Sequence, residues 1–581
     1  MRLSKVRSTN EISLNIIKDV TINGRRTTKV VESLGTERSL KEKLGVDDPY
    51  PWIKNYIASL NEQEREGKRK VTISYSPDKL IEKNQQVSYN CGYLFLQCIY
   101  NQLGLDKICH EIQDKYKITY SINEIMSRLV YSRILFPASK TATYELSQKY
   151  LEAPKFKSHQ IFRAMDCMYD AMDFIQAELY KNSNNVYSRN TRVLFYDCTN
   201  FYFATEQEEG IKQYGLSKDH QPAPIVQMGL FMDANGIPLA MSITPGNMNE
   251  QGTLKPLEQK IIKDFGLSEI VVCTDAGLAS HANRKFNNMN NRSYITTQSL
   301  KKLKSHLKDW VFEDNGWKLF SSHDDYNLTD IIDSLNSEED EDLYNKKLNR
   351  IYYKERWINE NGLEQRLIVT YSPKTAVYQH NIRLQQIERA EKAIKSGAKK
   401  LKSKNANDYR RFIDAVNSTK DGQPADNTIY TINQSSIEKE QMYDGFYGVC
   451  TNLEDDVMEI IKINKGRWEI EESFRIMKSD FKSRPIFHQN DDRIKTHFLT
   501  CYISLLVFRL LEKKLNDKYT VDEIISTLKD MNMHKIRGEG YLPSYMATEL
   551  TDLLHETFGF RTDYQIVTNH EMKKIIKITK N

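Results

Sequence analysis

Between residues 191 and 295 the chain alternates strand-like and helical segments in an order that narrows the choice of fold. TRVLFYDCTNFYF is rich in the residue types that favour strands. A hairpin with its turn at Asp233–Gly236 is predicted for PIVQMGLFMDANGIPLAMSITPG. An amphipathic helix is predicted for LKPLEQKIIKDFGL. SEIVVCT then predicts a short buried strand. The predicted order is strand, strand, strand, helix, strand. Two of these strands are expected to end at an aspartate, Asp197 and Asp275.

A third carboxylate comes from the later segment GRWEIEESFRIMKSDF, which predicts a helix. At about 100° per residue, one apolar stripe forms, and its members are Ile463, Ile470, Phe474, Met477 and Phe481. Glu471 falls beside this stripe in a charged line with Arg467 and Lys478, whereas Glu469 and Glu472 are expected to point away. Glu471 is therefore the carboxylate expected at the rim of a buried site. A surface helix that carries ordinary Glu–Arg and Glu–Lys pairs remains the alternative.

These elements occur in the order of a ribonuclease-H-like fold: three strands, a helix, a strand, an insertion, a further strand (DGFYGVCTNL) and the helix of Glu471. Phosphodiester chemistry uses two divalent ions about 3.5–4 Å apart, and Mg²⁺ takes hard oxygen ligands. Asp197, Asp275 and Glu471 could supply them. Taken singly, an aspartate at a strand end is more often a turn or helix cap, so the three together carry the hypothesis.

The spacing around Glu471 also resembles a known family. Arg467, Glu471 and Lys478 match the Tyr-x2-Arg-x3-Glu-x6-Lys signature of a group of bacterial insertion-sequence DDE transposases, in its larger-protein branch. The signature tyrosine is replaced by Asn464. FYDCTNFYF, GLSKDHQPAPIVQMGLFMD, VVCTDAGLAS, DGFYGVCTN and RPIFHQNDDRIKTHFLTCY are also similar to this group. The resemblance runs from about residue 13 to about residue 515.

The resemblance implies that Asp197, Asp275 and Glu471 are the catalytic residues and hold two Mg²⁺ ions, for which Mn²⁺ would substitute. The reaction would be cleavage of DNA at the element's ends and attack of the freed 3′-hydroxyl on target DNA. The implied partners are double-stranded DNA, as terminal inverted repeats and target, and a second subunit in the DNA complex. A metal-dependent nuclease without joining activity and a catalytically silent DNA-binding protein remain alternatives.

The fold class expected is α/β, with a ribonuclease-H-like core interrupted by a mostly β insertion. Residues 13–34 predict a hairpin around Asn23–Gly24, and 35–85 look polar and irregular. The expected domains are an N-terminal hairpin and linker (1–85), a helical and DNA-binding domain (86–190), the catalytic core (191–295 and 441–515), an inserted β-rich subdomain (296–440) and a C-terminal helical region (516–581).

Several further residues are candidates for DNA contacts. Lys218 and His220 follow the first catalytic strand, and Arg467 and Lys478 share the face of Glu471, where phosphate contacts would compete with a helix salt bridge. Asn283 is expected to cap locally. Trp310, Trp317 and Trp357 are more often core residues than base-stacking wedges. The basic stretch Lys392–Arg411 would suit phosphate or simply be a solvated face.

Composition limits the class of protein. With 83 basic and 78 acidic residues the net charge is +5, which excludes a uniformly basic protein but not local basic patches. The eight cysteines include no Cys-x-x-Cys pair, so neither a zinc site nor a disulfide framework is expected. The N-terminus has no apolar segment typical of a signal peptide. Phe498–Phe508 is too short an apolar run to span a bilayer and predicts a core helix. A bacterial cytoplasmic, nucleoid-associated protein is expected.

Overall fold

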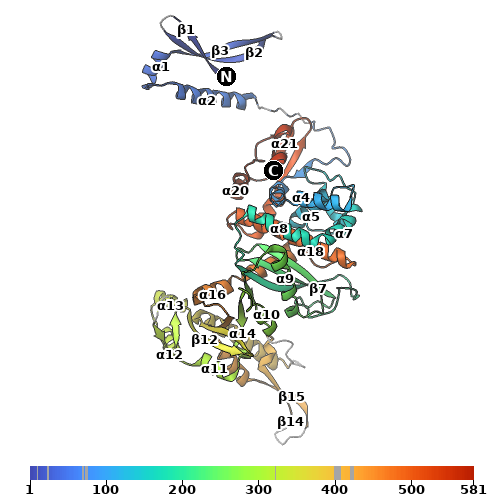
Figure 1. The fold of residues 1–581 in the computed structure, drawn as a ribbon, viewed down its shortest axis with the longest axis vertical. Helices are drawn as coiled ribbons and strands as arrows, with labels where there is room; N and C mark the ends of the chain where they lie inside the picture. Colours follow the sequence, from blue (N-terminus) through green and yellow to red (C-terminus); the bar gives the residue numbers. More distant parts are fainter. Residues whose placement is uncertain are drawn as a thin grey trace. The chain divides into compact units, whose positions relative to one another are not determined.

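The computed structural model describes all residues except 9–10, 23–24, 69–70, 72, 74–75, 321, 323, 398–406, 419–423 and 581. The chain divides into two compact units, Met1–Gln85 and Gln86–Asn581, whose elements are labelled in Figure 1. Each unit is described by itself.

The first unit is a three-stranded antiparallel sheet with two helices. Its strands are β1 (Arg2–Arg7), β2 (Ile12–Ile22) and β3 (Arg25–Thr36), and its helices are α1 (Glu37–Leu44) and α2 (Tyr50–Lys68). β2 and β3 pair as the predicted hairpin requires, although its turn, Asn23–Gly24, lies outside the described residues. The prediction of irregular chain over 35–85 is wrong for 37–68, which are mostly helical, and holds for the described residues of 71–85. The Thr36 hydroxyl caps α1. Each helix buries one apolar residue in the core of this unit, Leu40 in α1 and Ile53 in α2. Because many of the surrounding residues are polar or charged, the sequence shows no clear apolar periodicity.

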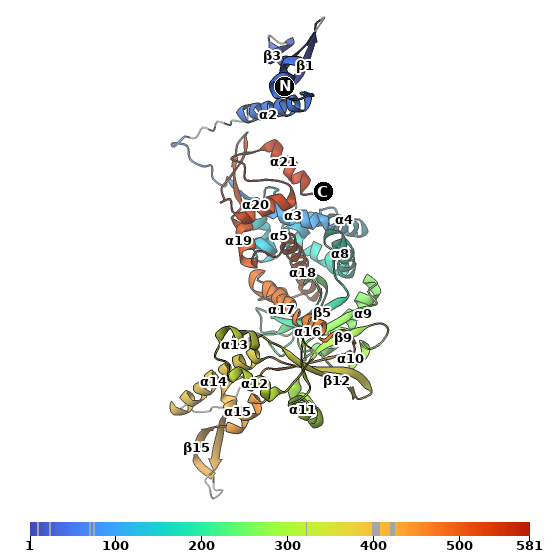
Figure 2. The ribbon, with the colours of Figure 1, turned by 90° about the vertical axis from the view of Figure 1, so that its left-hand side faces the viewer.

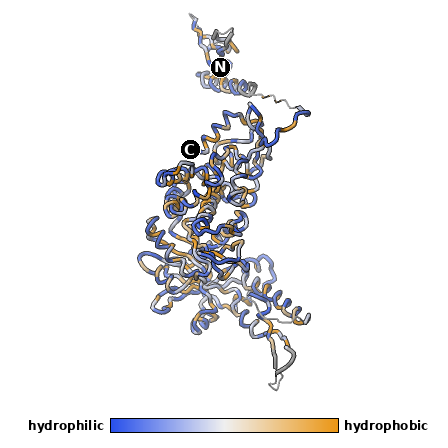
Figure 3. The backbone as a smooth tube through the Cα atoms, turned by 90° about the vertical axis from the view of Figure 1, so that its right-hand side faces the viewer, coloured by the Kyte–Doolittle hydropathy of each residue, from blue (hydrophilic) through white to orange (hydrophobic). Residues whose placement is uncertain are grey.

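The second unit begins with the predicted helical module. Its helices are α3 (Tyr93–Gln102), α4 (Leu105–Tyr116), α5 (Ile122–Leu135), α6 (Lys140–Ser147), α7 (Gln160–Asp170) and α8 (Met172–Val186). They surround α18 (Asp491–Lys514), which packs against α3, α5, α7 and α8. Among the described helices, α18 alone has the length and hydropathy to cross a membrane, but 94% of its apolar window is buried inside the protein. The prediction of a core helix is therefore confirmed. In Figure 3 hydrophobic positions, in orange, run through the interior of this unit.

A mixed sheet of ten described strands forms the centre of the second unit, in the order β11-β10-β12-β13-β16-β9-β8-β5-β6-β7. The predicted core strands are β5 (Val193–Tyr202), β6 (Ile225–Asp233), β7 (Pro238–Pro245), β8 (Val271–Thr274) and β16 (Phe446–Thr451). A further strand that was not predicted, β9 (Ser293–Gln298), lies between β8 and β16. β5, β8 and β9 are parallel neighbours, and the other pairings are antiparallel. Helix α9 (Leu254–Phe265) connects β7 to β8, and α10 (His281–Phe286) connects β8 to β9.

The region 296–440 differs from the mostly β insertion expected. Its strands β10 (Trp317–Leu319), β11 (Asp325–Tyr326), β12 (Tyr352–Glu360) and β13 (Leu363–Tyr371) extend the central sheet beyond β16. The described part holds more helix than strand, in α11 (Ser305–Phe312), α12 (Leu328–Asn336), α13 (Glu341–Leu348), α14 (Pro373–Lys395) and α15 (Gln434–Gln441). A separate strand pair, β14 (Ile413–Ser418) and β15 (Pro424–Ile432), projects beside them (Figure 2). The 23-residue α14 buries few side chains, so its apolar periodicity is weak.

The C-terminal region was expected to be helical and is not wholly so. Helices α19 (Val521–Asp530), α20 (Glu549–Phe558) and α21 (Asn569–Ile578) alternate with β17 (Asn532–Ile536), β18 (Gly540–Pro543) and β19 (Val567–Thr568). These strands form a four-stranded sheet in the order β19-β18-β17-β4, completed by β4 (Ser88–Asn90). Strands this short depend on a partner from the other end of the chain, which sequence periodicity does not reveal.

Candidate active site

The two aspartates continue the register of two adjacent parallel strands, Asp197 within β5 and Asp275 directly after β8. Val193–Phe195 of β5 pair in register with Val271–Cys273 of β8 at a constant separation of 78 residues, and the same 78 residues separate Asp197 from Asp275. Asp275 follows the end of β8 directly, as predicted. β5 does not end at Asp197 but continues to Tyr202, because its remaining residues also pair with β6.

The surroundings of Asp197 disfavour a negative charge. Burial raises the pKa of Asp197 to about 6, and the charge of Asp275 adds to the rise, while Lys218 and Arg467 oppose it. The backbone N–H of Cys198 donates to Asp197 Oδ1 at 2.7 Å. The pair of aspartates thus carries negative charge that the protein compensates only in part, and a cation would favour its ionised form.

Asp275 also has a local structural role. The backbone N–H of Leu278 donates to Asp275 Oδ1 at 2.9 Å, so the turn-capping alternative raised by the sequence holds for this oxygen. A Cβ added at Gly277 would lie 3.2 Å from Asp275 Oδ2, so the chain passes close to the second oxygen. Asn283 holds the same loop, because its Nδ2 donates to the carbonyl oxygens of Gln251 and Leu278. The carboxylate is therefore fixed in orientation at the end of its strand.

Glu471 lies on α17 (Trp468–Arg475), a helix that packs against β5. Its side chain is 65% exposed, and Glu471 Oε1 is 3.7 Å from Arg467 Nη2. Arg467 is the link to the aspartates, because its charge also acts on the pKa of Asp197.

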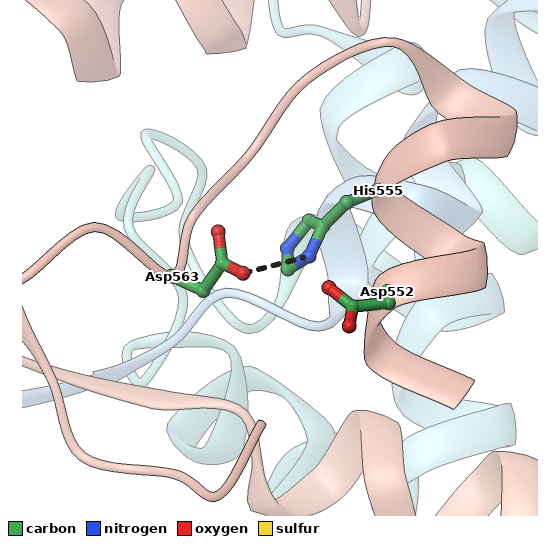
Figure 4. A group of neighbouring side chains, drawn as sticks. All are labelled: Asp552, His555 and Asp563. Carbon is green, nitrogen blue, oxygen red and sulfur yellow. Dashed lines mark ion pairs between the residues drawn. The ribbon is translucent and has the colours of Figure 1, made fainter. Parts of the chain in front are cut away.

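Asp197, Asp275 and Glu471 do not form a closely spaced set of metal ligands. Among the described residues, only Asp552, His555 and Asp563 bring three potential ligand atoms within 4.8 Å of one another (Figure 4). That group is an ion-pair cluster, since Arg561 pairs with both of its carboxylates. The amide N–H of Thr562 also donates to His555 Nε2.

The apolar face predicted for the Glu471 helix is correct. Ile470, Phe474, Met477 and Phe481 are all buried. The expectation that Glu469 points away is wrong, because Glu469 pairs with the buried Arg509 of α18. The projection assumed one continuous helix, whereas α16 (Val457–Lys465) ends at a turn, α17 starts anew at Trp468, and a π-helical turn follows at Ile476–Asp480.

Residues 188–507 match the family described as "Transposase DDE domain". This match covers more than half of the chain. The chain belongs to this family.

Two solved structures are similar to the chain at low levels. A piggyBac transposase synaptic complex with hairpin DNA is 8% identical, with a TM-score of 0.35 over 84% of this chain and 85% of that one. A Mos1 transposase paired-end complex with the left transposon end is 10% identical, with a TM-score of 0.13 over 43% of this chain and 68% of that one. No curated protein matches the chain. The assignment therefore depends on the family match alone.

The DDE transposase domain contains all three candidate carboxylates and begins just before β5. It ends within α18, which packs against the preceding helical module. The C-terminal sheet lies outside the match.

A loop between β5 and β6 brings Lys218 to the aspartates. Lys218 Nζ donates to the Cys198 carbonyl at 2.6 Å and lies 3.0 Å from Glu250 Oε1. Burial alone would lower the pKa of Lys218, but the charges of Asp197 and Glu250 outweigh it and raise the pKa. The Asn200 side chain anchors the loop, because its Oδ1 accepts from the backbone N–H of Lys218 and its Nδ2 donates to the Leu216 carbonyl oxygen. Sequence reasoning found Lys218 but missed Glu250, which stands in a polar segment after β7 without a motif.

The same loop also meets the end of the Glu471 segment. Asp219 pairs with Lys478 at 3.5 Å and with Arg484. Burial lowers the pKa of Lys478, and Asp219 opposes this. Thus Lys478 points to the loop rather than to Glu471. His220 is exposed, with φ of 54°.

Asn464, at the signature tyrosine position, holds a tyrosine from another element. Asn464 Nδ2 donates to the hydroxyl of Tyr447 on β16 at 2.9 Å, and that hydroxyl is 2.7 Å from Thr297 Oγ1. Tyr447 is 40% exposed. Tyr447 lies 17 residues before Asn464 on a different element, and no helix or strand period covers that separation, so no linear pattern reveals this pairing.

The remaining candidates differ in their surroundings. Trp317 is fully buried, Trp310 is partly buried with the Lys354 ammonium over its ring, and Trp357 is 45% exposed. In the basic stretch 392–411, residues 398–406 lie outside the described residues. Arg411, at its end, pairs with Glu440.

Proposed function

We propose that this protein is a DDE transposase with a ribonuclease-H-like core. In this proposal it cleaves DNA at the ends of an insertion sequence and joins the freed 3′-hydroxyl ends to target DNA. The observation that carries the proposal is that Asp197 and Asp275 lie at equivalent positions along the parallel strands β5 and β8, with Asp275 one residue past the end of β8 and Glu471 on a helix packed against β5. Three antiparallel strands followed by a helix and two parallel strands support the core assignment.

The candidate residues fit divalent metal ions. Carboxylate oxygens are the ligands that Mg²⁺ prefers, and the raised pKa of Asp197 indicates negative charge that a cation would compensate. Asp197, Asp275 and Glu471 would hold two Mg²⁺ or Mn²⁺ ions. When bound, such ions stabilise the attacking and leaving oxygens of a phosphodiester displacement.

The chain's own cations would position the DNA. Arg467 and Lys218 stand beside Asp197 and can contact the phosphates that flank the scissile bond. Lys478 and His220 would contact the strand further along the β5–β6 loop. Arg467 would exchange Glu471 for a phosphate when that carboxylate turns to a metal ion.

The wider expectations belong to the same proposal. The chain would belong to the Tyr-x2-Arg-x3-Glu-x6-Lys group. Asn464 stands at the position of the signature tyrosine, and the hydroxyl of Tyr447 would take the place of the missing one. It would act on terminal inverted repeats as a dimer in the DNA complex, in the bacterial cytoplasm.

Cleavage and joining can be tested separately. Purified protein is mixed with Mg²⁺ and a plasmid that carries the DNA flanking the coding sequence, and nicks are mapped. A second reaction supplies pre-cleaved ends with free 3′-hydroxyls and a target plasmid. Joined products support a transposase. Cleavage without joining would indicate a nuclease, and DNA binding without either would indicate a silent protein.

A further inference from the structure

A cavity of about 410 Å³ lies where α6 meets the segment after the Glu471 helix. Its lining includes Arg133, Ser139, Lys140, Arg484, His488 and His497. None of its lining residues, all of them described, is acidic. The cavity therefore has cationic and imidazole groups beside an apolar wall and no carboxylate of its own.

Lys140 is the unusual member of this lining. The residue is only 4% exposed, and its Nζ has no hydrogen-bond partner among the described residues. Burial, with the positive charge of Arg133 as a smaller cause, lowers the pKa of Lys140 to about 7. An ammonium that is buried without an acceptor is costly, so an anion that entered the cavity would gain a donor that the fold does not use.

Arg133 adds a fixed positive charge. Its Nη1 donates to the Phe481 carbonyl at 3.0 Å and its Nη2 to the Ala138 carbonyl at 3.3 Å. Its Nε has no partner among the described residues. Because carbonyl oxygens carry no net charge, these bonds orient the guanidinium without neutralising it.

Helix α6 begins at the same cavity. Ser139 is its N-cap and accepts from the Ala142 N–H. The N-terminus of a helix is the positive end of its dipole and favours anions. The partial positive charge at the start of α6 therefore adds to the positive charges of Lys140 and Arg133.

The two histidines in the cavity supply no opposing charge. Burial lowers the pKa of His488 to about 3, and burial also lowers that of His497. The charges of Lys140 and Arg133 both contribute to these shifts, and all four residues line the same cavity.

We propose that this cavity binds a phosphate group of the DNA backbone. The cavity wall is connected to the candidate active site, because Arg484 pairs with Asp219 and Lys478 pairs with the same carboxylate. Asp219 follows Lys218, which lies beside Asp197. A strand held at Lys140 would therefore continue along the β5–β6 loop toward the aspartates. Free phosphate has the same chemistry, and the choice of DNA depends on the proposed function.

The test compares the full chain with its Lys140→Met variant. Without anion, Lys140→Met should raise the melting temperature, because it removes a buried charge that has no partner. Inorganic phosphate should raise the melting temperature of the unmodified protein but not of the variant. On a mixed-sequence DNA duplex, the variant should bind roughly tenfold more weakly, and its slope of log K against log salt should fall by about one.

Two further variants control the test. Lys354 is equally buried, but its Nζ donates to the Glu313 carbonyl at 2.9 Å. Lys354→Met should lower the melting temperature and leave the DNA salt slope unchanged. Lys140→Arg keeps the charge and should keep the slope, and Lys140→Gln replaces Lys140→Met if the latter does not fold.

The outcomes distinguish an anion site at Lys140 from the identification of DNA as its ligand. A phosphate effect that persists without the Lys140 charge would overturn the site. A phosphate effect that is lost while DNA affinity and salt slope stay unchanged would overturn DNA as the source and indicate a free anion. Binding needs no catalysis, so a protein that proves unable to cleave DNA leaves this test intact.

Discussion

Arg467 Nη2 lies 3.7 Å from Glu471 Oε1, and the charge of the same guanidinium acts on Asp197. Arg467 thus links the carboxylate of α17 to the aspartates of β5 and β8. The Glu471 side chain is 65% exposed and the Arg467 side chain 18% exposed, and an ion pair with one solvated partner contributes only about 0–1 kcal/mol. Glu471 can therefore exchange Arg467 for a metal ion at little cost, while Arg467 becomes available for a phosphate.

Glu469 and Glu471, two residues apart on α17, should respond in opposite ways to neutralisation. Glu471→Gln should abolish cleavage with little change in stability, because its side chain is 65% exposed. Glu469→Gln should lower the free energy of unfolding by about 1–3 kcal/mol, because it weakens the pairing of the buried Arg509. Denaturant unfolding and DNA cleavage, measured on both variants, check this.

Two results would contradict these roles of Glu469 and Glu471. Full cleavage by Glu471→Gln would remove this residue from the site. Loss of cleavage by Glu469→Gln at a temperature where it is folded would mean that the two roles are reversed.

Asp197→Asn should change how stability depends on pH. The ordinary pKa of 3.8 rises to about 6 in the folded protein, so the folded state binds more protons than the unfolded state between these values. The free energy of unfolding contributed by Asp197 therefore falls as pH rises from about 4 to about 6, by at most about 3 kcal/mol. The variant should lack this fall and should be the more stable protein at pH 7 without metal.

Metal ions should reverse that advantage. Mg²⁺ or Mn²⁺ binds the ionised carboxylate, so metal should raise the melting temperature of the unmodified protein increasingly above pH 6, and should not raise that of Asp197→Asn. Glu258 is the matched control, because burial raises its pKa to about 7 away from the site. Glu258→Gln should keep the metal response, and a metal response in Asp197→Asn would contradict the assignment.

Asn90 should be a strong determinant of stability. Its Nδ2 donates to three carbonyl oxygens at the end of α19, of Leu528, Lys529 and Met531, at 2.9–3.2 Å. Asn90→Ala should leave the buried Leu528 carbonyl without its donor and the Tyr93 N–H without its acceptor, and lower the free energy of unfolding by about 2 kcal/mol. Thermal unfolding measures this, with Asn345→Ala, at an exposed position of α13, as the control; equal effects would contradict it.

The parts of the fold that follow from local pattern were predictable. The hairpin of β6 and β7, helix α9 and strand β8 each carry their own signal of period, turn residues and flanking polarity. The register that places Asp197 beside Asp275 is a pairing between distant segments, and the sequence supplied only two strands that both bear an aspartate.

The errors share a physical cause. The partner of Glu469 is Arg509, 40 residues later, and an isolated helical projection cannot include it. β17 and β4 pair across most of the chain, so neither short strand has enough local apolar pattern to be recognised. Tyr447 reaches Asn464 only because β16 and α16 are packed together by the fold.

Lys218 should set the pH at which the site becomes ionised. Its charge opposes the rise in the pKa of Asp197, so Lys218→Gln should move that pKa above 6 and shift the onset of metal stabilisation to higher pH. Lys260, which pairs with Asp173 on α8, offers a control: Lys260→Gln should leave the onset unchanged. Melting temperatures with and without Mn²⁺, measured across pH 5–9 for the three proteins, report the onset directly. If Lys218→Gln lowers the metal response equally at every pH, Lys218 holds the loop through the Cys198 carbonyl rather than tuning Asp197.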